Sequence, residues 1–285
     1  MPELPEVETV RRGLSRVSLN QPVRGGEVRL ARTIAFPERA EDFLPGVEGS
    51  QLVAWHRRGK YLLGELQRCA NTGLEPAGWL GVHLRMTGQL LWVNQGEELQ
   101  THCRVRLFFD GDRELRYVDQ RTFGRLWWVP PSESVESVMT GLQKLGPEPF
   151  SAEFSVAYLA NALKGRKRPI KNALLDQSLV AGVGNIYADE ALFMSGIRPM
   201  VMCDRLSKQR VARLHEAVIQ VLKTSIESGG TTFSDFRDVH GTNGNYGGVA
   251  WVYGRKDEPC RTCDRPIVKL QLAGRSAHYC PKCQR

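Results

Sequence analysis

The chain has 285 residues, enough to bury a large core and to form two domains, and its composition is typical of a globular protein. No apolar run approaches the roughly 20 residues that span a bilayer, and no basic segment followed by an apolar one marks a secretory signal, so we expect a cytoplasmic protein without a membrane anchor. The formal net charge of +8 favours a polyanionic partner, although many basic proteins bind no nucleic acid.

The first ten residues, MPELPEVETV, predict a helix that begins near Pro5. A proline suits the first turn of a helix, because the N–H that it lacks would have no partner there. Glu6 and Glu8 would then lie near the positive end of the helix dipole. This helix accounts for Pro5, Glu6 and Glu8, but it gives no reason for Pro2 and Glu3.

The first half of the chain, up to about residue 130, predicts short strands. Segments 104–110, 113–119 and 125–130 are rich in β-branched, aromatic and alternating apolar residues, and a tight turn can join the first two. The segments QLVAWHRRGKYLLGEL and GWLGVHLRMTGQLLWV have the same character. Several such strands with turn signals predict a β-sandwich or barrel.

A segment rich in proline and serine, VPPSESVESV, follows the predicted strands, and the apolar residues after Phe154 recur with a helical period. The clearest helix runs from Leu206 to Ser228 and is stopped by two glycines. Six residues are expected on its buried face: Val211, Leu214, Val218, Val221, Leu222 and Ser225. The predicted divisions are a β domain at 1–131, a linker at 132–150, a helical domain at 151–252 and a tail at 253–285.

The tail contains two CxxC pairs, Cys260 with Cys263 and Cys280 with Cys283, separated by sixteen residues. Each pair can hold one metal from a tight turn, and the residues between can form a hairpin, which gives a tetrahedral zinc site. A redox motif and two disulfides are the alternatives, and both are weaker because redox motifs rarely come as two spaced pairs. Four protein ligands leave no open position, so we expect one structural Zn²⁺ that does no chemistry.

The tail is also basic, since residues 255–285 contain eight Lys or Arg against three Asp or Glu. The remaining cysteines are isolated in the sequence and are expected to be buried free thiols. They are Cys69, Cys103 and Cys203.

Three motifs occur together in this chain: PELPEVE at the N-terminus, GVGNIYADEAL in the helical half and VYGRKDEPCRTC in the tail. Together they resemble the formamidopyrimidine-DNA glycosylases, bacterial repair enzymes for oxidised purines, and the resemblance spans essentially the whole chain in the expected order. It implies a multidomain α+β protein with an N-terminal β-sandwich, a helix–two-turns–helix domain and a zinc-bound β-hairpin. It also implies double-stranded DNA with oxidised bases as the substrate, and we expect a monomer.

The resemblance gives a role to the first residues. A small second residue permits removal of Met1, which exposes Pro2 as a secondary amine. An α-amino group has an ordinary pKa of about 7.7–8.0, against about 10.4 for lysine, so a useful fraction is neutral at pH 7. The resemblance implies that this amine attacks C1′ of the damaged nucleoside and forms an imine, after which β- and δ-elimination cut the strand. Glu3 is then the proton donor, with Glu6 in a supporting position.

The resemblance also assigns contacts with DNA. Lys60 and Arg275 are implied as proton donors for the eliminations that also contact phosphate, although single cations are usually solvated surface residues. Asn185 stands at an apparent helix start, where backbone N–H groups bind anions, and it matches a phosphate-binding asparagine; an ordinary glycine turn with an asparagine cap is the alternative. His102 and Lys171 are implied as further DNA-binding residues.

A base inside a duplex must be extruded before the amine can reach it, and the gap must be filled. The resemblance implies that Met86, Arg121 and Phe123 fill it, whereas the sequence pattern alone favours core packing for the methionine and the phenylalanine. The polar, glycine-rich segment 231–248 lies where the family places the loop that closes over the extruded base, and no lesion-recognition residue is assigned within it.

Two alternatives remain. One is an endonuclease VIII-like glycosylase for oxidised pyrimidines, against which Leu4 and the presence of all three gap-filling residues count. The other is a non-catalytic zinc-ribbon DNA-binding protein, which would have no use for an exposed Pro2 amine beside Glu3.

Overall fold

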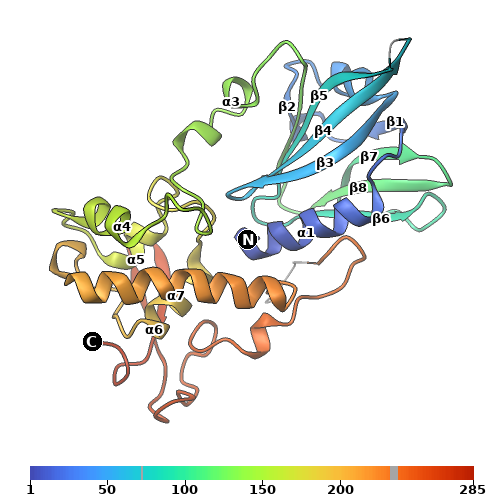
Figure 1. Cartoon of the computed structure of the whole chain (residues 1–285). Coiled ribbons are helices and arrows are strands. Elements are labelled where there is room, and N and C mark those ends of the chain that lie inside the picture. The colour runs from blue at the N-terminus through green and yellow to red at the C-terminus, as the bar shows by residue number, and fades with distance from the viewer. Residues whose placement is uncertain (72, 232–236) are drawn as a thin grey trace. The chain divides into compact units, whose positions relative to one another are not determined.

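The computed structural model describes residues 1–71, 73–231 and 237–285. These residues form two compact units, and many of their helices and strands are labelled in Figure 1. Unit 1 consists of Met1–Gln143 and Gly229–Asn245, and unit 2 consists of Lys144–Ser228 and Tyr246–Arg285. Residues 229–245, which the predicted divisions place in the helical domain, therefore group with the β-rich unit. None of the described helices is both long enough and apolar enough to cross a bilayer.

Unit 1 contains a long N-terminal helix, α1 (Leu4–Val17), and two β-sheets. The four-stranded sheet has the order β1-β7-β8-β6, and the five-stranded sheet has the order β2-β9-β5-β4-β3. Neighbouring strands are antiparallel except β2 and β9. The strands are β1 (Val23–Val28), β2 (Ile34–Phe36), β3 (Ser50–Arg58), β4 (Tyr61–Ala70), β5 (Gly73–His83), β6 (Gly88–Asn94), β7 (Cys103–Phe109), β8 (Arg113–Asp119) and β9 (Arg125–Val129). Two short helices, α2 (Phe43–Val47) and α3 (Val135–Val138), and the 3-10 turns η1 (Ala31–Thr33), η2 (Ala40–Asp42) and η3 (Leu142–Lys144) complete the elements up to residue 144.

One hydrophobic core joins α1 to both sheets. It includes Val10 of α1, Leu80 of the five-stranded sheet and Leu107 of the four-stranded sheet, each at most 2% exposed. Side chains along β7 alternate between buried and half-buried, as expected when one face of a strand is turned to a core. The predicted β-sandwich is thus confirmed, and the segments predicted as strands from 104 to 130 form β7, β8 and β9.

Unit 2 is helical, with a hairpin near its C-terminal end. Its elements are α4 (Val156–Leu163), α5 (Ile170–Leu174), α6 (Asn185–Met194), η4 (Cys203–Arg205), α7 (Lys208–Glu227), η5 (Tyr246–Gly248), β10 (Val268–Leu272) and β11 (Arg275–Tyr279). The Ser207 side chain caps α7 by accepting a hydrogen bond from the Arg210 N–H, and all six residues predicted for the buried face of this helix are buried. The predicted helix is therefore confirmed.

The three isolated cysteines differ in their burial. Cys103 and Cys203 are buried, as predicted, but Cys69 is exposed, so its predicted burial is wrong. Cys69 pairs with Leu74 near the tip of the β4–β5 hairpin, where residues on both strands are exposed. The end of this hairpin extends beyond the buried part of its strands, and the residue pattern alone does not show where burial ends.

Candidate active site

The N-terminal residues are held by a reciprocal pair of hydrogen bonds. Glu3 is the N-cap of α1, its side chain accepts from the Glu6 N–H, and its own N–H donates to Glu6 Oε2 at 2.8 Å. Pro2 is buried, and Glu3 and Glu6 are 2% and 1% exposed. Pro5 lies in the first turn, so the predicted helix start is confirmed. The residue that follows Pro2 is thus fixed in one orientation.

Glu6 also binds the second segment of unit 1. Its Oε1 accepts a hydrogen bond of 2.8 Å from the N–H of Thr231. Thr231 is the first residue of the segment 231–248, the predicted loop that closes over the extruded base. Residues 232–236 of that loop lie outside the described residues. Further along, Val239 is 1% exposed, and its carbonyl accepts from the Trp92 N–H at 2.8 Å. The described residues on both sides of 232–236 therefore contact the first segment of unit 1, Met1–Gln143, and Thr231 does so through Glu6.

Glu8 holds α1 to the neighbouring strand. Its carboxylate accepts hydrogen bonds from Arg11, Arg12 and Arg57, and Arg57 belongs to β3. Burial alone would raise the pKa of Glu8, but the hydrogen bonds from Arg11 and Arg12 outweigh it and lower that pKa to about 2. The Glu8 carboxylate therefore stays charged, and it fixes the helix whose first turn carries Glu3.

Lys60 lies in the tight turn between β3 and β4 and is only 7% exposed. It is therefore no solvated surface lysine, the alternative that its sequence context left open. His83, at the end of β5, is also buried, and this burial, with the charges of Arg85 and Lys60, lowers the pKa of His83 to about 3. A neutral His83 can accept at Nδ1, and it does so from the Arg85 N–H at 3.0 Å.

The three residues predicted to fill the gap in DNA lie on two loops of unit 1. Phe123 is 51% exposed, which rules out core packing for it, and the Arg121 guanidinium lies 4.9 Å from the centre of its ring. Met86 is half-buried in the turn between β5 and β6. His102 is half-buried, its carbonyl accepts from the Asp119 N–H at 3.0 Å, and its Nδ1 lies 3.2 Å from an Arg104 nitrogen.

In unit 2, Asn185 and Arg275 lie close together. Asn185 is the first residue of α6, whose N-cap is Gly184, so the asparagine side chain is no helix cap. Its Nδ2 donates to Ser276 Oγ at 3.2 Å, and Ser276 follows Arg275 in the chain. Arg275 is exposed at the start of β11 and forms no ion pair with any residue that the structure describes. Its guanidinium is therefore available to an anion from solvent.

Lys171, predicted to contact DNA, is instead fully buried. Its Nζ donates to Asp189 Oδ1 at 2.6 Å and to the Ser276 carbonyl. The other oxygen of Asp189 accepts from the His278 N–H at 2.9 Å and from its Nδ1 at 3.1 Å. The Lys171–Asp189 pair therefore fixes the backbone of β11 at two positions beside Arg275.

Sequence reasoning missed the two adjacent carboxylates of α6. Asp189 binds β11, and Glu190 accepts hydrogen bonds of 2.7–2.9 Å from the N–H groups of residues 251–253. Burial raises the pKa of Glu190, and these N–H groups oppose the shift. The available signal was a pair of acids inside the apolar run 186–193, because charged groups are rarely buried without a partner.

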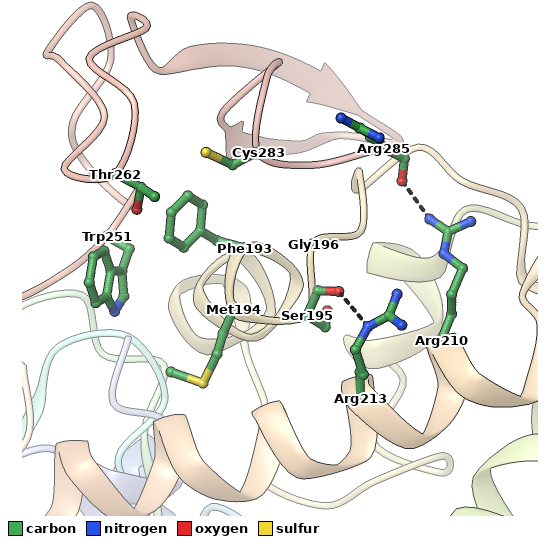
Figure 2. A pocket seen from close by; sticks show the side chains of 10 residues that line it. All are labelled: Phe193, Met194, Ser195, Gly196, Arg210, Arg213, Trp251, Thr262, Cys283 and Arg285. Atoms are coloured by element: carbon green, nitrogen blue, oxygen red, sulfur yellow. Dashed lines mark hydrogen bonds between the residues drawn. The ribbon is translucent and has the colours of Figure 1, made fainter.

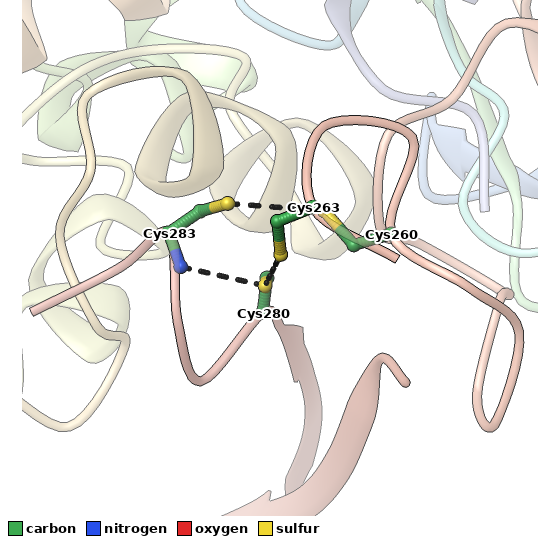
Figure 3. Close-up of side chains that lie close together, drawn as sticks. All are labelled: Cys260, Cys263, Cys280 and Cys283. Carbon is green, nitrogen blue, oxygen red and sulfur yellow. Dashed lines mark hydrogen bonds between the residues drawn. The ribbon is translucent and has the colours of Figure 1, made fainter. Parts of the chain in front are cut away.

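The four tail cysteines converge on one point (Figure 3). Their sulfur atoms all lie within 4.8 Å of one another, with Cys260 and Cys283 at 3.9 Å and Cys263 and Cys280 at 3.5 Å. Tetrahedral zinc with Zn–S bonds of about 2.3 Å would place its sulfur ligands about 3.8 Å apart. The donor set and its spacing therefore fit one closed zinc site.

A cavity of about 760 Å³ in unit 2 borders the zinc site, since Thr262 and Cys283 are among the residues that line it (Figure 2). Phe193 and Trp251 stack on one another at its wall, with ring centres 5.5 Å apart. Arg210 and Arg213 lie on α7 at the opposite side, and each donates to a backbone carbonyl. Of the predicted site residues only the zinc ligand Cys283 lines this cavity, so it is no pocket for the predicted chemistry.

Three family models match successive parts of the chain. They are the formamidopyrimidine-DNA glycosylase N-terminal domain over residues 1–126, the formamidopyrimidine-DNA glycosylase H2TH domain over 145–237, and the zinc finger found in FPG and IleRS over 257–285. The formamidopyrimidine-DNA glycosylases of Acaryochloris marina and Nostoc sp. are each 62% identical to the chain over 284 residues, covering 100% of this chain and 99% and 100% of theirs.

Solved structures are similar over the same length. The MutM (Fpg) protein of Thermus thermophilus has a TM-score of 0.86 and 38% identity, covering 99% of this chain and 98% of its own. A variant Fpg of Lactococcus lactis in complex with Fapy-dG-containing DNA has a TM-score of 0.89 and 31% identity, with complete coverage of both chains. The wild-type L. lactis protein, solved with an oxidised-pyrimidine DNA, has a TM-score of 0.88, 32% identity and complete coverage of both chains.

Proposed function

The chain belongs to the family of the formamidopyrimidine-DNA glycosylases, and we propose that Pro2, exposed by removal of Met1, is its nucleophile. Membership of this family makes the chain a DNA repair glycosylase for oxidised purines. The observation that carries the choice of nucleophile is the buried hydrogen-bond pair between Glu3 and Glu6, because it orients the residue that follows Pro2.

The proposed reaction proceeds through an imine. The neutral Pro2 nitrogen attacks C1′ of the damaged nucleoside, the bond from C1′ to the base breaks, and its electron pair leaves with the base, which takes up a proton. The attacking nitrogen becomes cationic and gives up its N–H proton, which is the proton that the base takes up. As the base leaves, Glu3 protonates the sugar ring oxygen and the ring opens. The freed nitrogen lone pair then forms the C=N bond of a cationic imine, because proline is a secondary amine. The imine acidifies the neighbouring sugar protons, so β-elimination and then δ-elimination release both flanking phosphates.

Lys60 and Arg275 serve as proton donors for these eliminations and contact the phosphates beside the lesion, and Asn185 binds phosphate as well. The burial of Lys60 excludes a solvated surface lysine, and the lack of an ion-pair partner for Arg275 among the described residues leaves its charge available to a phosphate. Met86, Arg121 and Phe123 fill the gap that the extruded base leaves, a role supported by the exposure of Phe123.

His102 contacts DNA in this proposal, but Lys171 does not contact it directly. Its ammonium is buried and donates to Asp189 and to a backbone carbonyl, which favours a structural role. We assign Lys171 the role of fixing β11, so that Arg275 is presented to the DNA.

The four tail cysteines hold one structural zinc ion, and the zinc organises the hairpin that carries Arg275. In functional terms, we assign residues 1–131 to catalysis, 132–150 to a linker, 151–252 to DNA binding and 253–285 to the zinc finger. A monomeric state and a cytoplasmic location stay proposals.

Oxidised pyrimidines are a second candidate class of substrate. The observation in favour is that a relative with 32% identity was solved with DNA containing an oxidised pyrimidine. Comparing cleavage of duplexes that carry 8-oxoguanine, a formamidopyrimidine or an oxidised pyrimidine would rank these substrates.

The test of the nucleophile is borohydride trapping, because an imine is reduced to a stable amine that links enzyme to DNA. Processed protein should trap lesion-bearing DNA through its N-terminal nitrogen. Protein that retains Met1, or carries a tag before Pro2, should not trap although its folding and zinc content are unchanged. Glu3→Gln should keep the amine but slow base release by roughly 100- to 10,000-fold. Equal trapping by tagged protein would move the nucleophile elsewhere, with Lys60 next in line.

A further inference from the structure

Asp119 is a buried carboxylate, 1% exposed, at the end of β8. Two loops of unit 1 meet at this side chain. The first is the turn 84–88, which carries Met86 and is closed by a hydrogen bond of 2.9 Å from the Gly88 N–H to the Leu84 carbonyl. The second is the loop 119–124, which carries Arg121 and Phe123.

The contacts between the two loops pass through Thr87. Its hydroxyl donates to Asp119 Oδ1 at 2.5 Å and accepts from the Arg121 N–H at 3.0 Å. The other carboxylate oxygen closes the second loop by accepting from the Gly124 N–H at 2.8 Å. One side chain from each loop therefore holds the backbone of 119–124 against the turn that carries Met86.

The site needs an acceptor that offers no proton. Three donors face the carboxylate: the Thr87 hydroxyl, the Gly124 N–H and the Tyr117 hydroxyl, the last at 3.4 Å from Oδ2. Burial and the nearby Asp119 charge raise the pKa of Tyr117, so its hydroxyl keeps its proton. An asparagine at position 119 would turn its own N–H₂ group toward one of these donors.

Both loops also pack against the same tyrosine. A Cβ added at Gly124 would lie 1.6 Å from the Tyr117 hydroxyl oxygen, and one added at Gly88 would lie 2.5 Å from it. Glycine is required at both positions because the backbone approaches Tyr117 so closely.

Each loop contains a strained residue beside a gap-filling one. Arg85, before Met86, has a φ of 53°, and Thr122, between Arg121 and Phe123, has a φ of 56°. Residues with a side chain rarely adopt this left-handed conformation, least of all a β-branched threonine, and it persists only where the surroundings impose it. The two loops that present the gap-filling residues therefore contain strained backbone at Arg85 and Thr122 and contact one buried carboxylate, Asp119.

We propose that Asp119 and Thr87 are positioning residues that join these two loops, so that Met86, Arg121 and Phe123 enter the duplex as one rigid unit. Side chains held in place before binding lose less freedom when they replace the extruded base, which makes extrusion more favourable. This inference rests on the gap-filling roles proposed above, and the experiment separates the two.

The variants are Thr87→Val, which keeps the shape and removes both hydrogen bonds of the hydroxyl, and Asp119→Asn. The control is Ser18→Ala, because the buried Ser18 hydroxyl also donates one hydrogen bond, to the Leu14 carbonyl, and accepts another, from the Trp55 indole. Unfolding in urea gives the stability lost by each variant.

Two measurements are made under single-turnover conditions with 8-oxoguanine. The first is extrusion and excision from a paired duplex, with 2-aminopurine fluorescence beside the lesion reporting extrusion. The second is excision of the same lesion from a one-nucleotide bulge, where it is unpaired and extrusion needs little energy. Thr87→Val and Asp119→Asn should slow extrusion and excision from the paired duplex by about ten-fold, the rate equivalent of one lost hydrogen bond. The same variants should change the rate of excision from the bulge less than about two-fold. Ser18→Ala should change neither.

Coupling between the loops gives a second measurement. Met86→Ala and Phe123→Ala should have non-additive effects on extrusion in the parent protein, and additive effects in the Thr87→Val background. Equal slowing on both substrates, or coupling that survives Thr87→Val, would overturn the proposal that Asp119 and Thr87 join the two loops. If Met86→Ala and Phe123→Ala leave extrusion unchanged, the gap-filling roles themselves fail, and the inference fails with them.

Discussion

Lys171→Met tests whether the buried lysine is structural or contacts DNA. The substitution leaves Asp189 buried at 0% exposure with its two hydrogen bonds to His278 but without its cation. Removing one partner of a buried ion pair typically costs about 3–5 kcal/mol, because the remaining charge is uncompensated. The free energy of unfolding of unit 2 should fall by that amount, whereas unit 1 should be unaffected.

The size of this effect can be checked with a second substitution. Adding Asp189→Asn to Lys171→Met removes the uncompensated charge, so the double variant should recover part of the lost stability. Trp251 is the only tryptophan in unit 2, so the other five tryptophans can be replaced by phenylalanine to make fluorescence specific for this unit. Release of zinc to a chelating dye in urea reports the hairpin independently.

DNA binding distinguishes an indirect role from a direct one. If Lys171 acts by placing β11, Lys171→Met should weaken binding in the parent protein and have no further effect in an Arg275→Ala background. If Lys171 instead binds a phosphate directly, its effect should add to that of Arg275→Ala, and each substitution should reduce the salt dependence, d log K/d log[salt], by about 0.9. Additive effects on binding with unchanged stability would refute the structural assignment.

Three further outcomes are expected. Cys260→Ser should abolish zinc binding and weaken DNA binding sharply while unit 1 stays folded, because structural zinc contributes on the order of 10–16 kcal/mol to such modules; zinc-free parent protein on metal analysis would contradict this. Met86→Ala should impair base extrusion with little change in melting temperature, whereas a loss of about 2–5 kcal/mol would show that the side chain is core. His83 binds a proton below about 6.5 when unfolded but only below about 3 when folded, so it makes stability rise with pH in that window. His83→Asn, which keeps an acceptor for the Arg85 N–H, should flatten urea stability against pH by up to about 1.4 kcal/mol per pH unit, and an unchanged slope would show that His83 titrates normally.

Features that depend on neighbouring residues in the sequence were predicted well. The strands around 104–130 and the buried face of α7 follow from periodicity, and the zinc ligands follow from the spacing of two short pairs. The capping pair of Glu3 and Glu6 is also local, since its members are three positions apart. The residue pattern there predicted only a helix start, and the structure adds the reciprocal hydrogen bonds.

Features that depend on distant residues were not predicted. Thr87 and Asp119 are 32 positions apart, and His278 lies 89 positions from Asp189, so the burial of either carboxylate cannot be derived from its own surroundings in the sequence. The grouping of residues 229–245 with unit 1 is another feature that depends on distant residues. It depends on Val239, which enters a core made by the first half of the chain.

The two units present their exposed arginines by the same physical means. Asp119 and Asp189 are each buried near an arginine assigned to DNA, Arg121 in unit 1 and Arg275 in unit 2. Neither carboxylate pairs with that arginine: Asp119 binds the Gly124 N–H in the loop of Arg121, and Asp189 binds the His278 N–H in the strand of Arg275. A carboxylate bonded directly to either guanidinium would compete with phosphate for it. By binding the backbone instead, each carboxylate fixes the position of the arginine and leaves its positive charge for the DNA.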